Sequence, residues 1–152
     1  MDPADRESNA EALATAVWAA TEPGSGRFHP TEKRSDLAAL SDRLDELRRH
    51  GQGYLEVGLP DQEYPLLTVG FRGNHAVIHL FANADQVFLL GGDGTAPSTA
   101  EVEVPVIDDA AVFTGDFVLD VDQAWDRVRS FVRTASPSCL GQWWELQPPA
   151  EI

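Results

Sequence analysis

Four short apolar runs between Tyr54 and Leu90 constrain the fold of this 152-residue chain more than any other part of its sequence. They read YLEVG, YPLLTVGF, HAVIHLF and QVFLL, and residues that favour turns bound each run. Short runs rich in Val, Leu, Ile and aromatics, separated by turns, are typical of consecutive β-strands. The links at Gly73-Asn74 and Ala82–Asp85 are too short for the crossover that joins parallel neighbours, so the sequence predicts an antiparallel meander.

Alternation assigns the strand side chains to two faces of the predicted sheet. The first face is uniformly apolar and needs a cover of helices; its members are Leu55, Val57, Leu67, Val69, Phe71, Ala76, Ile78, Leu80, Val87 and Leu89. The second, mixed face carries aromatic, ionisable and polar groups; its members are Tyr54, Glu56, Leu66, Thr68, His75, Val77, His79, Phe81, Phe88 and Leu90. A mixed face is either an ordinary sheet face half open to water or a surface for a partner, because interfaces favour aromatics within a polar surround.

Two amphipathic segments can supply the helical cover. Between Ser35 and His50 leucines recur at spacings of three and four, and apolar residues from Val121 to Thr134 form a second stripe. Ser35 and Asp120 are the expected N-caps of these helices. The predicted fold class is therefore α+β: an antiparallel meander β-sheet with two main helices packed on one face.

Further strands are expected on both sides of the meander. The alanines of Ala12–Ala20 favour a helix, but the turn Glu22–Gly26 behind them favours a strand, with Arg27–His29 as its hairpin partner. Three later segments are also predicted as strands: Glu101–Val106, Ala111–Leu119 with a bend or bulge at Gly115, and Leu140–Leu146 at the sheet edge.

Length and composition indicate one domain in a reducing compartment. We predict a disordered segment over residues 1–10, a single domain over 12–146 and a loose tail over 147–152. The single cysteine, Cys139, excludes an internal disulfide. The sequence shows neither a signal-peptide core nor an apolar run of membrane-spanning length, so we expect a soluble, cytoplasmic protein.

Charge is the strongest functional signal in the sequence. The net charge of −14 repels nucleic acid and anionic membranes, and it attracts basic proteins. No Lys or Arg occurs from Gly73 to Asp126, a stretch that contains 10 acidic residues. Two adjacent tryptophans in a strand must face opposite ways, which leaves one as an exposed interface anchor. The candidate partner-binding residues are Asp85, Asp93, Glu101, Glu103, Asp108, Asp109, Trp143 and Trp144.

No catalytic or metal-binding pattern accompanies this charge. His75 and His79 share a strand face, but at the rise of a strand they lie roughly 13 Å apart, too far to ligate one metal. Cys139 lacks the context of a nucleophile, and the loop Gly91–Ser98 lacks the Gly-Lys-Ser/Thr ending of a phosphate-binding loop. We therefore expect a binding protein that is not an enzyme and uses no cofactor or metal.

The order of the segments resembles a bacterial immunity-protein family. The pieces Tyr54–Gly58, Gly91–Gly94 and Phe113–Phe117, within a span of roughly residues 12 to 146, resemble the Imm-type family one of polymorphic toxin systems. The resemblance implies a small cytoplasmic antitoxin that binds and blocks one cognate toxin domain. In similar gene pairs the toxin is often a nucleic-acid deaminase of the zinc-dependent cytidine-deaminase-like type.

The acidic charge is compatible with this resemblance. A toxin that acts on nucleic acid presents a basic groove to its substrate, and an acidic inhibitor can plug that groove. The alternative is a small-ligand-binding or regulatory module that uses the mixed face around His75, His79 and Phe88.

Overall fold

The computed structural model describes residues 14–146. The strands of its central sheet are β1 (Thr15–Thr21), β2 (Phe28–Asp36), β3 (Gln52–Gly58), β4 (Leu66–Arg72), β5 (His75–Phe81), β6 (Val87–Leu90), β9 (Leu119–Asp120) and β10 (Trp143–Glu145). A separate hairpin consists of β7 (Glu101–Val106) and β8 (Asp109–Thr114). The helices are α2 (Leu37–Arg49) and α3 (Val121–Thr134), with 3₁₀ turns η1 (Gly115–Phe117) and η2 (Pro137–Leu140).

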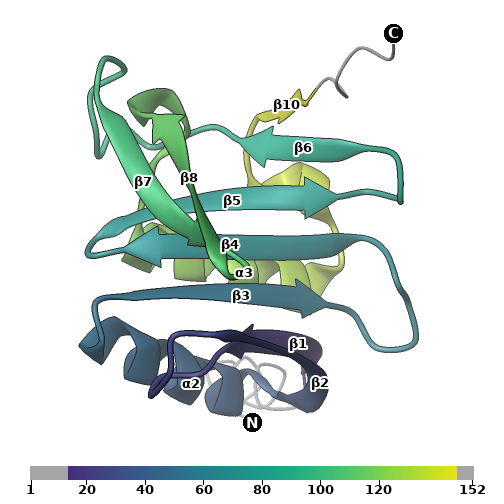
Figure 1. The fold of residues 1–152 in the computed structure, drawn as a ribbon. Helices are drawn as coiled ribbons and strands as arrows, with labels where there is room; N and C mark the ends of the chain where they lie inside the picture. The colour runs from purple at the N-terminus through teal and green to yellow at the C-terminus, as the bar shows by residue number, and fades with distance from the viewer. Residues whose placement is uncertain (1–13, 147–152) are drawn as a thin grey trace, which may run out of the picture.

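The predicted fold class is confirmed. The central sheet is antiparallel, with the order β10-β6-β5-β4-β3-β1-β2, and β9 pairs with β5. Figure 1 shows α3 behind the meander, α2 beside β3 and β1, and the hairpin β7–β8 crossing the front of the sheet. The molecule therefore has three layers: helices, central sheet and hairpin.

The N-terminal segment is a strand, as the turn chemistry favours, although residues 12 and 13 of the predicted segment lie outside the described residues. Its partner β2 is much longer than the predicted return at Arg27–His29, because pairing with β1 continues from Phe28 to Asp36. Most side chains of β2 are exposed. An edge strand without a buried face has no apolar alternation, so its extent is set by backbone pairing alone.

Both helices occupy the predicted segments, but α2 begins one residue later than its predicted cap implies. The N-cap of α2 is Asp36, whose carboxylate accepts a hydrogen bond from the backbone N–H of Ala39 at 2.9 Å. The predicted cap, Ser35, instead accepts a hydrogen bond from the indole N–H of Trp18 at 2.7 Å. Asp120 caps α3 as predicted.

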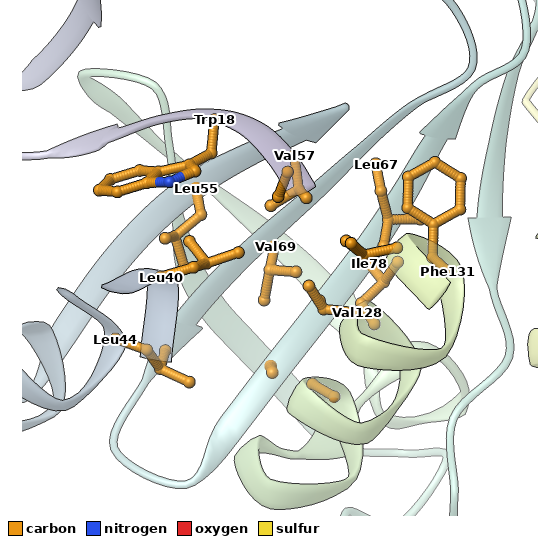
Figure 2. Close-up of a cluster of buried hydrophobic side chains, with 14 of the residues drawn as sticks. Trp18, Leu40, Leu44, Leu55, Val57, Leu67, Val69, Ile78, Val128 and Phe131 are labelled. Atoms are coloured by element: carbon orange, nitrogen blue, oxygen red, sulfur yellow. The ribbon is translucent and has the colours of Figure 1, made fainter. Parts of the chain in front are cut away.

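The main core lies between the helices and the apolar face of the sheet. Leucines at 37, 40, 44 and 47 of α2 and the apolar stripe of α3 pack on β3, β4 and β5. In Figure 2, Leu40 approaches Val69, while Val128 and Phe131 lie beside Ile78 and Leu67. Because these side chains are removed from water, this layer supplies most of the hydrophobic stabilisation.

The face assignment of β6 was wrong. Val87 and Leu89 were predicted on the helical side, but Phe88 and Leu90 pack there, whereas Leu89 belongs to the core under the hairpin. The register pairs Leu80 with Phe88, and paired residues share a face. The turn at residues 82–86 sets this register, and a shift of one residue exchanges the faces of a whole strand.

The predicted strand Ala111–Leu119 was also wrong in its second half. β8 ends at Thr114, and the chain then forms η1 and the short β9. A Cβ atom at Gly115 would lie 1.9 Å from the carbonyl oxygen of Pro97, so the backbone turns where only glycine fits. The predicted edge strand is confirmed in its place beside β6, but it covers only Trp143–Glu145.

Both predicted terminal segments, residues 1–10 and 147–152, lie outside the described residues. Within residues 14–146 neither helix has the length and apolar character needed to cross a membrane.

Candidate protein-binding surface

Hairpin β7–β8 covers part of the mixed sheet face. Val102 and Val104 of β7 pack with Val77, Leu89 and Val118 in a second, smaller core. The hairpin approaches the sheet closely at Gly70, where a Cβ atom would lie 2.1 Å from the carbonyl oxygen of Pro105. The hairpin is therefore a packed layer of the fold, and its inward side chains are not available to a partner.

The outward side of the hairpin is acidic with an apolar centre. Glu101 and Glu103 alternate with the buried valines of β7 and are exposed, and Val112 lies directly opposite Glu103 with 57% of its side chain exposed. At the turn Ile107 is 47% exposed and is followed by two aspartates. We call this set the acidic hairpin surface: Glu101, Glu103, Ile107, Asp108, Asp109 and Val112.

The turn of the hairpin holds an unusual backbone conformation. Ile107 has a φ of 58°, in the left-handed region that β-branched residues rarely adopt. Holding such a residue there costs of order 1 kcal/mol or more, and the side chain is half exposed rather than buried. The fold therefore tolerates backbone strain at a position where it displays an apolar side chain to solvent.

Several acidic members of this surface have partners within the chain. Glu103 forms an ion pair with Arg72 at 2.8 Å, and this arginine is the last cation before the stretch without Lys or Arg. The carboxylate of Asp108 accepts a hydrogen bond from the backbone N–H of Phe28 at 2.7 Å, which ties the hairpin turn to β2. The carboxylate of Asp109 accepts from the backbone N–H of Ala110. Glu101 is the member best placed to meet a partner without losing an internal contact.

Two of the predicted partner-binding residues, Asp85 and Asp93, lie outside the acidic hairpin surface. Asp85 is exposed in the turn between β5 and β6, where the side chain of Asn83 accepts from its backbone N–H. One oxygen of Asp93 accepts from the N–H of Thr95 at 2.9 Å, and the other accepts from the N–H of Asp120 at 3.0 Å. Burial raises the pKa of Asp93, but these hydrogen bonds outweigh it and bring the pKa below its usual value. Asp93 therefore organises the loop before β7.

Asp93→Ala is expected to destabilise this loop. The substitution leaves two backbone N–H groups without their carboxylate acceptor, and exposed hydrogen bonds of this kind contribute about 1 kcal/mol together. Chemical denaturation should report a loss of that size in the free energy of unfolding. The variant Asp85→Ala, in an exposed turn with no such bonds to its carboxylate, provides the control and should change stability by less than about 0.5 kcal/mol.

The two adjacent tryptophans face opposite ways, as predicted. Trp143 packs against the helical core, and its indole N–H donates to the carbonyl oxygen of Pro137 at 2.9 Å. Trp144 pairs with Leu89, so it lies on the hairpin side of the sheet, where it meets Phe117 edge-on at 5.9 Å. Its side chain is 44% exposed. Trp144 is thus the exposed one of this pair, and Trp143 is partly buried against the core.

The residues named for a small-ligand site do not come together. Phe88 packs on the helical side, and His79 lies under the hairpin with its ring 5.3 Å from that of Phe113. Burial lowers the pKa of His79 from 6.5 to about 4. His75 lies at a separate, shallow hollow beside Arg72 and the glutamates of β7.

Sequence reasoning missed the two apolar members of the acidic hairpin surface. Ile107 stands in a turn, and Val112 lies in a strand whose inward side could not be assigned without its partner. Their only sequence signal is an apolar residue within an acidic segment.

Comparison with known proteins identifies no relative: neither a protein-family model nor a curated protein matches this sequence. The family resemblance therefore stays a prediction. Within residues 14–146 no group of three or more His, Cys, Asp or Glu side chains is arranged to hold a metal ion.

Proposed function

We propose that this protein is an immunity protein (antitoxin) that binds a cognate toxin domain through the acidic hairpin surface. The observation that supports the proposal is the outward side of hairpin β7–β8, where every charged side chain is acidic and Val112 is 57% exposed at the centre. Interfaces commonly combine an apolar centre with a charged rim. The inward side chains of the same hairpin pack in the second core, so the surface is ordered before a partner binds.

The chemistry of this surface selects a basic partner. Four carboxylates, at positions 101, 103, 108 and 109, are exposed on one hairpin, and the whole chain carries a net charge of −14. Such a field speeds the association of a positively charged protein and disfavours nucleic acid itself. We propose a nucleic-acid-targeting deaminase as the toxin, because an enzyme that acts on nucleic acid presents a basic cleft that this hairpin could occlude. An antitoxin of this kind would act in the cytoplasm, where the toxin meets its substrate.

The experiment that tests the proposal is purification of partners from the source organism with the tagged full chain. We expect one stoichiometric, basic partner whose expression alone stops growth and whose toxicity is suppressed by this protein. A stoichiometric partner without toxicity would contradict the antitoxin assignment. Release of the partner by high salt would support occlusion through charge, because salt screens exposed charges.

Glu101→Lys is expected to weaken binding of that partner about fivefold at low ionic strength, with a smaller effect at high salt. The change replaces an exposed carboxylate that forms no hydrogen bond or ion pair within residues 14–146, whereas Glu103→Lys would also break the ion pair with Arg72. Glu46→Lys, an equal change of charge on the exposed side of α2, is the matched control. Equal losses for Glu101→Lys and Glu46→Lys would mean that net charge, and not this surface, controls binding.

A further inference from the structure

The edge strands of this fold differ in how well they are protected against pairing with another chain. The edge strand β2 contains Pro30, Lys33 and Arg34, and the opposite edge strand β10 has only three residues. The β7 side of the hairpin contains Pro105, which has no N–H to donate. Prolines, positive charges and short length are the usual means by which proteins prevent edge pairing. β8, with the sequence DAAVFT, has none of these features over six residues.

The free edge of β8 has a defined set of backbone groups. Val106 pairs with Asp109 across a two-residue turn, which makes it a hydrogen-bonded pair. The alternation of an antiparallel ladder then directs the N–H and C=O groups of Ala110, Val112 and Thr114 away from β7. Within residues 14–146, Ala110 is the one of these three residues whose backbone N–H has an acceptor outside the ladder, the carboxylate of Asp109 at 2.9 Å.

An apolar row lies on the sheet beside this edge. Leu66 pairs with Phe81, and Phe81 with Val87, so these three side chains line one transverse row on the hairpin side of the sheet, and Gly58 pairs with Leu66 at its end. Leu66, Phe81 and Val87 are each only half-buried. The row ends at Leu146, which donates its backbone N–H to the carbonyl oxygen of Val87 and is 41% exposed. We call Leu66, Phe81, Val87 and Leu146 the apolar row.

β8 runs in the same direction as this row. Its first residue follows Asp108, which is bonded to Phe28 of β2, and η1 behind its last residue reaches Trp144 of β10. Phe113 lies over His79, which is two residues from Phe81 in β5. The β7 side faces the other way, towards Arg72 and His75. Figure 1 shows β8 crossing the front of the sheet, and beyond it the ends of β4, β5 and β6 that no other labelled element crosses on this front side.

We propose that β8 and the apolar row together form a docking site for an extended segment of a partner protein. The segment would add as a strand to the free edge of β8, with main-chain hydrogen bonds to Val112 and Thr114. Alternate side chains of an added strand point towards the sheet below, so they would meet the apolar row. The site therefore selects a segment in which apolar side chains alternate with others that stay in solvent.

The negative charge of the hairpin favours basic side chains on the outward side of that segment. It also disfavours a second copy of this chain as the partner. They would lie two strands away from Glu101 and Glu103, roughly 10 Å at the spacing of a sheet, which is within about one Debye length. Lysine or arginine is favoured at these positions. Two copies that paired through β8 would each bring a net charge of −14 and the same acidic hairpin. This inference goes beyond the proposed function, because it does not depend on whether the partner is a toxin.

The test uses the full chain and a defined probe, the peptide acetyl-Lys-Val-Lys-Val-Lys-Val-Lys-amide. A peptide of the same composition, acetyl-Lys-Lys-Val-Val-Val-Lys-Lys-amide, has the same charge without the alternation. NMR of the chain labelled with ¹⁵N and with ¹³C in its methyl groups should show shifts and slowed amide exchange at Val112 and Thr114 with the alternating peptide, and methyl shifts at Leu66 and Val87. We expect the control peptide to bind about tenfold more weakly.

Two variants at Val112 distinguish the contribution of its backbone N–H at the strand edge from the contribution of its side chain. Val112→Pro removes an outward N–H, and the ladder with β7 does not use that group, so the hairpin should persist. It should weaken binding of the alternating peptide about tenfold, whereas Val112→Ala keeps the N–H and should change affinity by less than about threefold. The amide spectrum of the variant without peptide shows directly whether the hairpin is still folded.

Four outcomes would overturn the docking site: equal binding of both peptides, undiminished binding to Val112→Pro, no binding at all, or protection of the β8 amides by self-association seen in sedimentation. The two-peptide comparison does not rely on any variant, so a misfolded variant leaves the test intact. Failure of the docking site would leave the proposed function standing, because a toxin could bind the acidic hairpin surface without adding a strand. Success of the docking site would not show that the partner is a toxin.

Discussion

Replacing Gly70 with alanine is expected to lower the free energy of unfolding by about 3 kcal/mol, because the new methyl group cannot be accommodated under the hairpin. Its Cβ would lie 2.1 Å from the carbonyl oxygen of Pro105, which is backbone and cannot rotate away as a side chain could. The hairpin must move outward or detach, and the contacts of Val104 with the sheet are lost with it. We expect the helical core to persist, since the methyl group added at Gly70 would point towards the hairpin and away from the helices.

Chemical denaturation and NMR chemical shifts of β7 and β8 check this expectation. Gly58→Ala is a matched control on the same face of the neighbouring strand, where a Cβ atom would make only ordinary contacts, the closest at 3.5 Å to Leu66. The control should change stability by less than about 0.5 kcal/mol. If both variants are equally stable, the hairpin is not held as closely to the sheet as the structure places it.

The Gly70→Ala variant also tests whether partner binding requires an ordered hairpin. A protein with an intact helical core but a detached hairpin should lose partner binding, because the acidic hairpin surface would no longer be ordered. Retained binding by a variant whose hairpin signals are displaced would show that the partner uses another part of the molecule.

Acidification from pH 6.5 towards pH 4 is expected to remove up to about 3 kcal/mol of stability through His79 alone. Burial lowers the pKa of His79 to about 4 in the folded chain, whereas the unfolded chain has the ordinary value of 6.5. Between these two values the unfolded chain binds a proton that the folded chain does not, so stability falls as the pH falls. Well above pH 6.5, His79 is neutral in both states and contributes no pH dependence.

The measurement is the difference between wild type and His79→Gln in urea denaturation at a series of pH values. A difference is needed because the 25 Asp and Glu residues also titrate at the low end of this range. We expect the variant to lose less stability than wild type between pH 6.5 and 4.5. Parallel curves would mean that the ring of His79 is hydrated and not covered by Phe113.

The elements that have a local period can be predicted from the residues alone. The leucine stripe of α2 and the alternation in β3, β4 and β5 each identify a buried face without knowledge of the rest of the chain. The sequence also predicts the acidic stretch and the opposite directions of Trp143 and Trp144, because charge and strand geometry are local properties.

Three features depend on packing between distant segments: the faces of β6, the length of β2 and the layer formed by the hairpin. The same packing determines which carboxylates have partners: Asp108 bonds to Phe28, 80 positions away, and Glu103 bonds to Arg72. The exposure of Val112 and the free edge of β8 depend on where the hairpin packs. A periodic pattern is repeated in every turn or pair of residues and so appears in the sequence, whereas the register of a turn or a contact between distant strands depends on a single geometry that no local pattern records.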